Sequence, residues 1–431
     1  MFNIIKNIAL KTDHFFYKKF GSDKSLKFLE NIKEARKIFS YLNETGHESR
    51  VKFVGGCVRK ALSGENIEDI DLATSLEPEE VKKRLNNKNI KIIETGISHG
   101  TIVAILNGKK FDITTLRKDV ATDGRHASVE FTSDWKKDAS RRDFTVNSIY
   151  ADIEGRIFDP YNGVSDLKSG KLKFIGSPKE RIQEDYLRIL RYFRFFIQYS
   201  KSDHEIETIQ AIKQNINGLN KISNERIFDE LQKIFKLKNA SNLFLKDSSK
   251  DIILNIFPQF RHHERLKTNN KLSNALQNKY DVYLILGLLI IDGSNNYEYF
   301  CHKYKTSKKI KNRFNNISIN FNNFKRKNFF SEENIKKMIY LKGKEEVMDL
   351  LLFSICIYKK IDILNINKLI DYIKNCKIPK FPISGEYLKN QGFKTGEALG
   401  KKLKLLEKKW IENNFIIKKE IIQKPLGKDK N

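Results

Sequence analysis

Two aspartates, spaced two residues apart, are the first side chains in this sequence that could do chemistry. Asp69 and Asp71 flank Ile70 in a segment with strand-like residues. On a strand, both carboxylates would point to one face and repel each other. Mg²⁺ would relieve that repulsion, because it prefers oxygen ligands and usually takes one or two carboxylates plus substrate phosphates. The pair therefore predicts a catalytic Mg²⁺ site for phosphoryl or nucleotidyl transfer, although such a pair alone is also typical of a solvated strand face or a turn.

A glycine turn precedes the aspartates. Gly55 and Gly56 lack a Cβ, so the backbone can turn sharply there and approach a ligand closely. Arg59 follows near the start of a predicted helix, where backbone N–H groups and a guanidinium suit a phosphate. The segment matches neither a Walker loop nor a GxGxxG turn. Together, the glycines and the aspartates favour a phosphate-binding site.

A second predicted strand supplies another carboxylate. Asp112 shares a face with Thr114 in the segment FDITTLR. If this strand lies beside the one that carries Asp71, Asp112 could be a third catalytic carboxylate, which ligates metal or helps to deprotonate an attacking hydroxyl. A purely structural role for Asp112 stays open. Arg117 ends the segment and could reach a phosphate.

Two later segments combine acids with arginines. In RRDFTVN, residues 141–147, Arg142 could pair with a triphosphate and Asp143 could accept from a ribose hydroxyl. In RIQEDYLRILRYFRF, residues 181–195, Asp185 and Arg188 could hydrogen-bond the Watson–Crick edge of C or A.

We expect residues 181–195 to form one helix. At about 100° per residue, Asp185, Arg188 and Arg191 lie within about 120° of arc, and Arg194 falls opposite Asp185. Taken alone, this pattern is also typical of an amphipathic core helix with i,i+3 charges.

The surrounding pattern predicts an α+β chain. Strand and helix signals alternate up to about residue 155, and after Gly163 long amphipathic helices follow. Asn107-Gly108 is a strong hairpin signal between two strands. We expect strands at residues 51–54, 90–94, 101–106 and 110–116, and helices at residues 25–42 and 79–85.

Composition favours a polyanionic partner. The 431 residues carry a formal net charge of +28, which favours nucleic acid as a partner, although a biased Lys-rich composition would give the same charge.

The four cysteines form no CxxC pair, and a reducing, cytoplasmic location fits. No apolar run is long enough to span a membrane, and no protein partner is predicted.

Five motifs in this order resemble the class II family of CCA-adding tRNA nucleotidyltransferases and bacterial poly(A) polymerases. They are GGCVRK with the following DID, RRDFTVN, DPYNGVSDL at residues 159–167, the segment 181–195, and SNERIFDEL at residues 223–231. The resemblance implies a polymerase-β-like palm followed by an all-α neck, body and tail. One position departs from it: Lys60 follows Arg59 where the family usually has Asp, a residue that would orient the arginine or the turn.

The resemblance also implies roles. Asp69 and Asp71 would hold Mg²⁺, and the RNA 3′-hydroxyl would attack the α-phosphate of CTP or ATP. The segment 223–231 would support the base-recognition helix without touching substrate. The implied nucleotide-binding residues are Gly55, Gly56, Arg59, Arg142, Asp143, Asp185, Arg188, Arg191 and Arg194.

Two activities share these motifs. His99-Gly-Thr and FDITTLR look like the CCA-adding type, and a GRRF-like segment of the poly(A) polymerases is absent. Residues 381–415 are similar to the terminal region of bacterial CCA-adding enzymes, which would hold the tRNA body. CCA addition to tRNA is therefore expected, with poly(A) addition as the alternative and a non-catalytic RNA-binding protein as a remote one.

The motifs also predict domain boundaries. We expect an N-terminal extension at residues 1–24, a palm at 25–160, a neck at 161–245, a body at 246–345 and a tail at 346–431.

Overall fold

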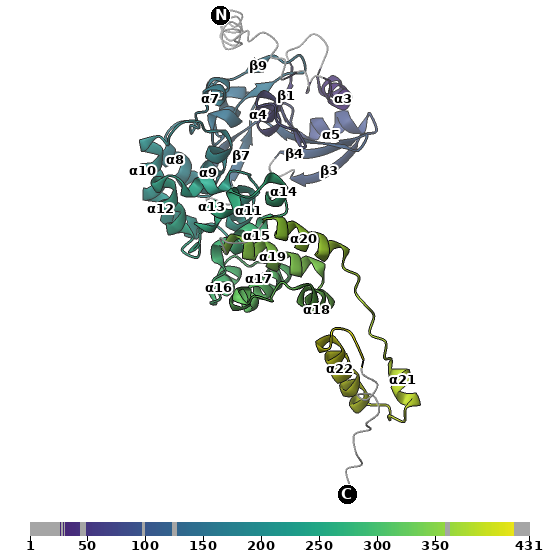
Figure 1. Ribbon diagram of the computed structural model, residues 1–431. Coiled ribbons are helices and arrows are strands. Elements are labelled where there is room, and N and C mark those ends of the chain that lie inside the picture. The colour runs from purple at the N-terminus through teal and green to yellow at the C-terminus, as the bar shows by residue number, and fades with distance from the viewer. Residues whose placement is uncertain are drawn as a thin grey trace, which may run out of the picture. The chain divides into compact units, whose positions relative to one another are not determined.

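The computed structural model describes residues 26, 29, 31–43, 49–96, 100–122, 127–357 and 363–417. The predicted N-terminal extension and His99 lie outside these residues. The chain forms two compact units, Met1–Ile256 and Phe257–Asn431, whose elements are labelled in Figure 1. The finer boundaries at residues 160, 245 and 345 stay predictions.

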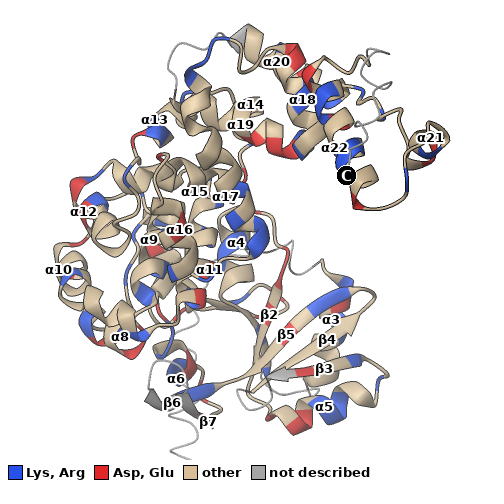
Figure 2. Cartoon of the chain, turned by 90° about the horizontal axis from the view of Figure 1, so that it is seen from below, with Lys and Arg blue, Asp and Glu red and all other residues tan. Residues whose placement is uncertain are grey.

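A mixed sheet of seven strands, in the order β3-β4-β5-β2-β1-β8-β9, forms the palm of the first unit. Strands β2 and β5 pair in parallel and lie side by side in Figure 2, whereas every other pair in this sheet is antiparallel. A separate two-stranded sheet pairs β6 with β7. The strands are β1 (Val51–Val54), β2 (Ile70–Thr74), β3 (Lys91–Gly96), β4 (Thr101–Leu106), β5 (Lys109–Thr115), β6 (Arg117–Thr122), β7 (Ala127–Phe131), β8 (Tyr150–Ala151) and β9 (Ile157–Phe158).

The two faces of the sheet differ in chemistry. Phe53, Leu72 and Ile113 point to one face and share a core with helices α3 (Lys33–Leu42), α4 (Gly56–Leu62) and α5 (Pro78–Asn86). Because side chains alternate along a strand, Asp71 and Asp112 point to the opposite face. The sheet thus buries its apolar side under helices and presents its carboxylates on the other, and the predicted α+β class is confirmed.

Local sequence patterns predict the hairpin of the palm correctly but fail for its first helix. Asn107 and Gly108 both have positive φ, 51° and 77°, and form the predicted hairpin turn between β4 and β5. The single helix expected at residues 25–42 is wrong, because Ile32 is extended and α3 begins only at Lys33. Ile32 is nevertheless buried in the palm core with Leu26 and Leu29, so the apolar pattern identified core residues although the helix is interrupted.

The remainder of the first unit is helical, as expected. Its helices are α6 (Trp135–Ser140), α7 (Gly163–Ser169), α8 (Pro178–Glu184), α9 (Arg188–Tyr199), α10 (Ile206–Asn215), α11 (Asn224–Phe235) and α12 (Asp247–Ile256), with short 3₁₀ turns η2 (Thr145–Asn147), η3 (Ile216–Lys221) and η4 (Ala240–Phe244).

The single helix expected at residues 181–195 is also wrong. Helix α8 ends at Glu184, Asp185 is extended, and α9 begins at Arg188. The Asp185 carboxylate accepts a hydrogen bond from the backbone N–H of Leu187 at 3.1 Å, a local bond that competes with the helix.

The second unit is all-α. Its helices are α13 (Arg265–Asn270), α14 (Asn274–Gln277), α15 (Val282–Ile290), α16 (Asn296–Lys303), α17 (Lys308–Asn320), α18 (Glu332–Lys342), α19 (Lys344–Ile357), α20 (Ile363–Asn375), α21 (Gly385–Asn390) and α22 (Glu397–Glu412), with η5 (Phe321–Lys325) after α17. Among the described residues, no helix combines the length and the apolar character that a membrane span needs.

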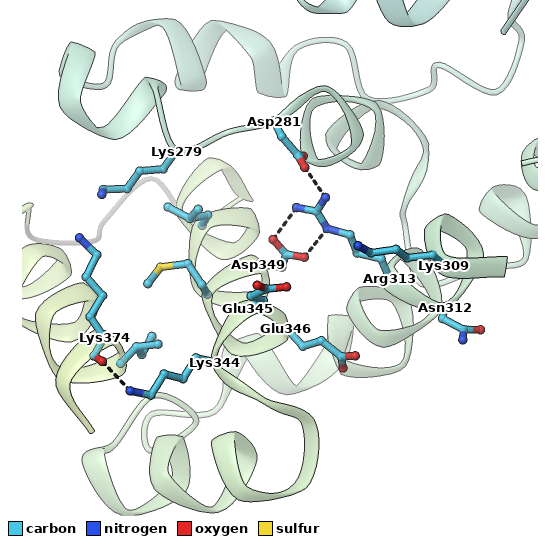
Figure 3. Close-up of a pocket in the computed structure, with 13 residues that line it drawn as sticks. Lys279, Asp281, Lys309, Asn312, Arg313, Lys344, Glu345, Glu346, Asp349 and Lys374 are labelled. Carbon is cyan, nitrogen blue, oxygen red and sulfur yellow. Dashed lines mark hydrogen bonds and ion pairs between the residues drawn. The ribbon is translucent and has the colours of Figure 1, made fainter. Parts of the chain in front are cut away.

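A cavity of about 680 Å³ opens in the second unit and is shown in Figure 3. Arg313 of α17 pairs there with Asp349 of α19, and it also pairs with Asp281, which precedes α15. Lysines and carboxylates both line this cavity. Because two carboxylates neutralise the guanidinium, we interpret Arg313 as a cross-link between helices.

Candidate active site

A larger cavity, of about 850 Å³, lies in the first unit on the carboxylate face of the sheet. Eight cationic side chains and four carboxylates are among its lining residues, so it favours a polyanion. All nine predicted nucleotide-binding residues line it, as do Asp69 and Asp71. The charged residues of the lining are Arg59, Asp69, Asp71, Arg117, Arg141, Arg142, Asp143, Asp185, Arg188, Arg191, Arg194 and Lys233.

Asp71 stands where negative charge is crowded. Burial raises its pKa, and the carboxylates of Asp112 and Asp69 raise it further, against the opposing effect of Arg142 and Arg59. Such a carboxylate is stabilised by a bound cation, so the chemistry of the donors fits Mg²⁺. Asp69 lies just before β2, not on it as predicted, because the strand begins at Ile70. It nevertheless lines the same cavity.

Asp112 is the direct neighbour of Asp71. The parallel register pairs Asp71 with Asp112, as the prediction required. However, Asp112 is not among the residues that line the cavity, and it forms an ion pair of 3.2 Å with Lys110. Within the described chain, no three His, Cys, Asp or Glu side chains are grouped to hold a metal ion. A metal at Asp69 and Asp71 would therefore take further ligands from substrate and water.

The glycine turn brings the backbone against two charged groups. Gly55 has φ +65°, and a Cβ there would stand 3.4 Å from Nη1 of Arg142. A Cβ on Gly56 would stand 3.4 Å from Oδ2 of Asp71. The glycines therefore leave open the space beside the Asp71 carboxylate and the Arg142 guanidinium.

Asp138 organises two arginines of the cavity. It is buried on α6 and accepts from Arg141 at 2.7 and 2.9 Å, from Arg142 at 3.0 Å and from the Tyr150 hydroxyl at 2.7 Å. Burial alone would raise the pKa of Asp138, but these neighbours outweigh it and hold its pKa well below the usual range. Sequence reasoning missed this residue, whose signal was an acid three and four positions before the two arginines.

Asp143 joins the RRDFTVN segment to helix α9. Its carboxylate accepts from Arg191 at 2.8 Å and from the Asn147 amide at 2.8 Å. Burial would raise the pKa of Asp143, but Arg191 and Asn147 lower it to about 2. The Asn147 side-chain oxygen in turn accepts from Arg59. One chain of hydrogen bonds therefore fixes Arg59, Asp143 and Arg191 relative to one another.

The base-reading candidates are each held by a partner of opposite charge. Asp185 pairs with Arg226 of α11 at 3.0 Å, and Arg188 pairs with Glu184 at 2.5 Å. Arg194 pairs with Glu230, a buried residue of α11. Helix α11 carries the SNERIFDEL motif, and its side chains pair with two of these candidates, Asp185 and Arg194.

Arg194, which the resemblance implied and helical geometry supported least, also lines the cavity. The helical arc that placed Arg194 opposite Asp185 assumed one continuous helix, and Asp185 lies outside α9. Phe195 and Lys233 line the cavity too and were missed. Phe195 looked like a core residue in an apolar run, and Lys233 lay outside every motif.

Comparisons with known proteins agree with this geometry. A family model described as the poly A polymerase head domain matches residues 51–173, and one described as a probable RNA and SrmB-binding site of polymerase A matches residues 204–262. The mitochondrial CCA tRNA nucleotidyltransferase 1 of Homo sapiens is 35% identical over 409 residues, which cover 91% of this chain and 89% of that protein. The chain belongs to the class II family of CCA-adding tRNA nucleotidyltransferases and bacterial poly(A) polymerases.

Solved structures of the family share the fold. The CCA-adding enzyme of Bacillus stearothermophilus in complex with CTP has a TM-score of 0.70 at 23% identity, and covers 91% of this chain and 94% of its own. The Thermotoga maritima enzyme complexed with tRNA has a TM-score of 0.63 at 22% identity, and covers 93% of this chain and 97% of its own. Like the other members, this chain is a nucleotidyltransferase.

The departure from the family at Lys60 leaves Arg59 well positioned. Its guanidinium carbon lies 4.7 Å from the centre of the Phe195 ring and 5.0 Å from that of Tyr199. It also donates to Asn147. Ring stacking and one amide therefore orient Arg59 without an aspartate at position 60.

Proposed function

We propose that this chain adds CCA to the 3′ end of tRNA, using CTP and ATP. The observation that carries the proposal is one cationic cavity that gathers Asp69 and Asp71 with all nine candidate nucleotide-binding residues. The names of its relatives support the choice of reaction. The human relative is a CCA tRNA nucleotidyltransferase, and the two fold relatives are CCA-adding enzymes bound to CTP and to tRNA.

The proposed reaction is a single displacement at phosphorus. The RNA 3′-hydroxyl oxygen attacks the α-phosphate, the bond to the β-phosphate breaks, and pyrophosphate leaves. Asp69 and Asp71 would hold Mg²⁺, which when bound acts as a Lewis acid toward the α-phosphate and lowers the pKa of the attacking hydroxyl. Asp112, adjacent to Asp71, stays the candidate for helping to remove the hydroxyl proton.

The other residues position the nucleotide. Arg59 and Arg142 would bind the triphosphate beside the open space of Gly55 and Gly56, with Arg191 and Arg194 adding positive charge. Asp143 would accept from a ribose hydroxyl. Asp185 and Arg188 would pair with the base, since an acceptor beside a donor fork matches an edge with an exocyclic amine. Because the protein holds these groups in fixed positions, the bound nucleotide would be oriented for attack by the 3′-hydroxyl.

Extension of a labelled tRNA that lacks its last three nucleotides tests the proposal. With Mg²⁺, CTP alone should add two nucleotides, and CTP plus ATP should give a discrete product three nucleotides longer. No extension under any condition would contradict the proposal.

Poly(A) addition is the second candidate, since the matching head model is described as that of poly A polymerase. It would give a long ladder with ATP alone, on tRNA and on unrelated RNA. Cytoplasmic location stays a prediction, and the human relative is named mitochondrial.

A further inference from the structure

A third cavity, of about 660 Å³, opens in the first unit beside helix α9. We call it the Tyr199 cavity, after the tyrosine that lines it and contacts Arg59 of the candidate active site. We propose that the Tyr199 cavity is a second binding site for a nucleotide. The inference goes beyond the proposed function, because none of the residues that line this cavity has a role in the reaction above.

Positive charge on the wall of the cavity suits a phosphate. Lys168, Lys201 and Lys238 line it, and Glu65 is its single carboxylate. Glu65 already accepts from the Gln198 amide at 3.0 Å. Among the described residues, Lys201 and Lys238 have no carboxylate within ion-pair distance, so both ammonium groups are available to an anion.

Lys201 is held in place by its backbone. Its N–H donates to the carbonyl of Gly170 at 2.9 Å, and its side chain lies so close to Gly170 that a Cβ there would stand 2.6 Å from Cβ of Lys201. The lysine therefore stands just after the end of α9, with its backbone fixed beside the cavity.

The rest of the lining suits the body of a nucleotide. Four half-buried aliphatic side chains provide an apolar surface for a base, namely Leu62, Leu167, Ile197 and Leu237. A pocket of several hundred Å³ is of the size that such ligands occupy. Apolar surface with a few polar groups and a cationic rim matches a nucleoside phosphate better than inorganic phosphate.

The Tyr199 hydroxyl supplies a polar group to the wall of the cavity. Tyr199 is 8% exposed, and Arg59 and Glu65 both lie close enough to its hydroxyl to affect its pKa. Burial raises that pKa, so the hydroxyl stays protonated at neutral pH and can donate to an acceptor of a ligand.

Binding stoichiometry tests the proposal. In equilibrium dialysis with labelled ATP and Mg²⁺, the unmodified chain should bind two equivalents, and the double variant Lys201→Glu, Lys238→Glu should bind one. The matched control Lys179→Glu, Lys213→Glu makes the same change in charge at exposed lysines outside this cavity, and should keep two. One equivalent in the unmodified chain, or two in the Lys201 and Lys238 variant, would overturn the proposal.

A second, more conservative variant tests whether loss of binding in the charge-reversal variant is caused by misfolding. The double variant Lys201→Gln, Lys238→Gln removes both positive charges and adds no carboxylate. We expect it to weaken binding of the second equivalent by about tenfold or more while binding of the first is unchanged, because charged hydrogen bonds to the phosphate are lost. Equal affinities in both proteins would contradict the two lysines as phosphate-binding groups.

Two competing ligands distinguish a site for free nucleotides from a site for a nucleotide of RNA. If AMP displaces the second equivalent of ATP, the site takes free nucleotides. If only a short single-stranded oligoribonucleotide displaces it, the site takes a nucleotide of RNA. Displacement by neither probe would contradict the proposal. Because binding is measured without incorporation, the result does not depend on whether the tRNA extension assay succeeds.

Discussion

At the scale of residues, several arginines of the candidate site form ion pairs with buried carboxylates. Arg142 is held by Asp138, Arg191 by Asp143 and Arg194 by Glu230. All three carboxylates are buried, so removal of either partner would leave an uncompensated charge. Substitutions at these arginines would therefore disturb folding as well as binding. The sharper tests of chemistry lie at Asp71 and at Asp185 and Arg188, the partly exposed candidates for reading the base.

Asp71→Ala should abolish incorporation of both CMP and AMP. Under the proposed function Asp71 binds the metal, so its loss would remove several kcal/mol of transition-state stabilisation, and we expect the rate to fall by about 10³-fold or more. Binding of tRNA should be nearly unchanged, because Asp71 lies among groups for the nucleotide. Single-turnover extension and a filter-binding assay measure the two effects, and strong residual incorporation would refute the metal assignment.

Arg188→Ala should relax the choice of base. The guanidinium is a candidate donor to the base edge, so its loss should let UTP or GTP compete about tenfold better against CTP and ATP. Arg181→Ala is the matched control, because Arg181 pairs with the same Glu184 but does not line the cavity. Selectivity is measured as the relative kcat/KM values for the four nucleotides in each variant. Unchanged selectivity in Arg188→Ala would rule out a base-reading role for Arg188.

At the scale of elements, short segments fix the arginine-bearing loop to its neighbours. Asp159 accepts from the backbone of Gly163 at 2.7 Å and of Val164 at 2.9 Å, which shapes the start of α7. Asp166 of α7 accepts from the Thr145 hydroxyl at 2.7 Å, inside RRDFTVN. The DPYNGVSDL motif therefore positions the RRDFTVN segment, and none of its own residues lines the cavity.

Gly163→Ala should destabilise this junction. A Cβ at Gly163 would stand 2.1 Å from the carbonyl oxygen of Thr145, so the backbone must shift, at a cost of about 2 kcal/mol or more. Gly400→Ala in α22 meets nothing within 4 Å and should stabilise that helix by up to about 1 kcal/mol. Guanidinium-induced unfolding measures both, and equal midpoints for Gly163→Ala and the unmodified chain would contradict the close contact.

The contact between α9 and α12 should depend on pH through His204. Its ring nitrogens bond the hydroxyls of Tyr192 and Ser249, its ring stacks on Phe196, and burial lowers its pKa to about 4. The unfolded chain therefore binds more protons between about pH 6.5 and 4, so stability from this group falls as pH drops through that window. Thermal unfolding of His204→Gln should show a shallower decline than the unmodified chain, and parallel curves would exclude the effect.

How far the sequence predicts these elements depends on how local their causes are. The Asn107-Gly108 hairpin and the glycine turn followed from residue types alone, because backbone conformation there is set within a few residues. The break at Asp185 did not, because a side-chain-to-backbone bond ended a segment whose pattern looked helical. The pairs that Arg226 forms with Asp185 and Glu230 with Arg194 could not be read from the sequence, because packing between helices brings these partners together. Asp138 differs, because it lies three and four positions before its two arginine partners and so left a local signal that was overlooked.

At the scale of the whole molecule, charge is the dominant property. The 431-residue chain carries a net charge of +28, while the arginines named above are already paired with carboxylates. Much of the excess positive charge therefore lies on surfaces outside the candidate nucleotide cavity. This distribution favours binding of RNA phosphates by many weak contacts.

Affinity for tRNA should fall steeply with salt. Each phosphate that the chain neutralises releases a counterion, and six or more such contacts would reduce affinity by about 10³-fold between 50 and 200 mM salt. Affinity for ATP should change much less over that range. Fluorescence titrations at four salt concentrations measure both, and a flat response for tRNA would contradict an electrostatic mode of binding.

On either side of the break between α8 and α9, the two candidate base-reading groups are paired with different helices. Asp185 is tied through Arg226 to α11, whereas Arg188 is tied through Glu184 to α8. A small shift of one helix would therefore move the hydrogen-bond acceptor without moving the donor. Under the proposed function, the spacing between acceptor and donor is an adjustable quantity. An enzyme that must accept a pyrimidine and then a purine, while refusing the other two bases, needs an adjustment of this kind.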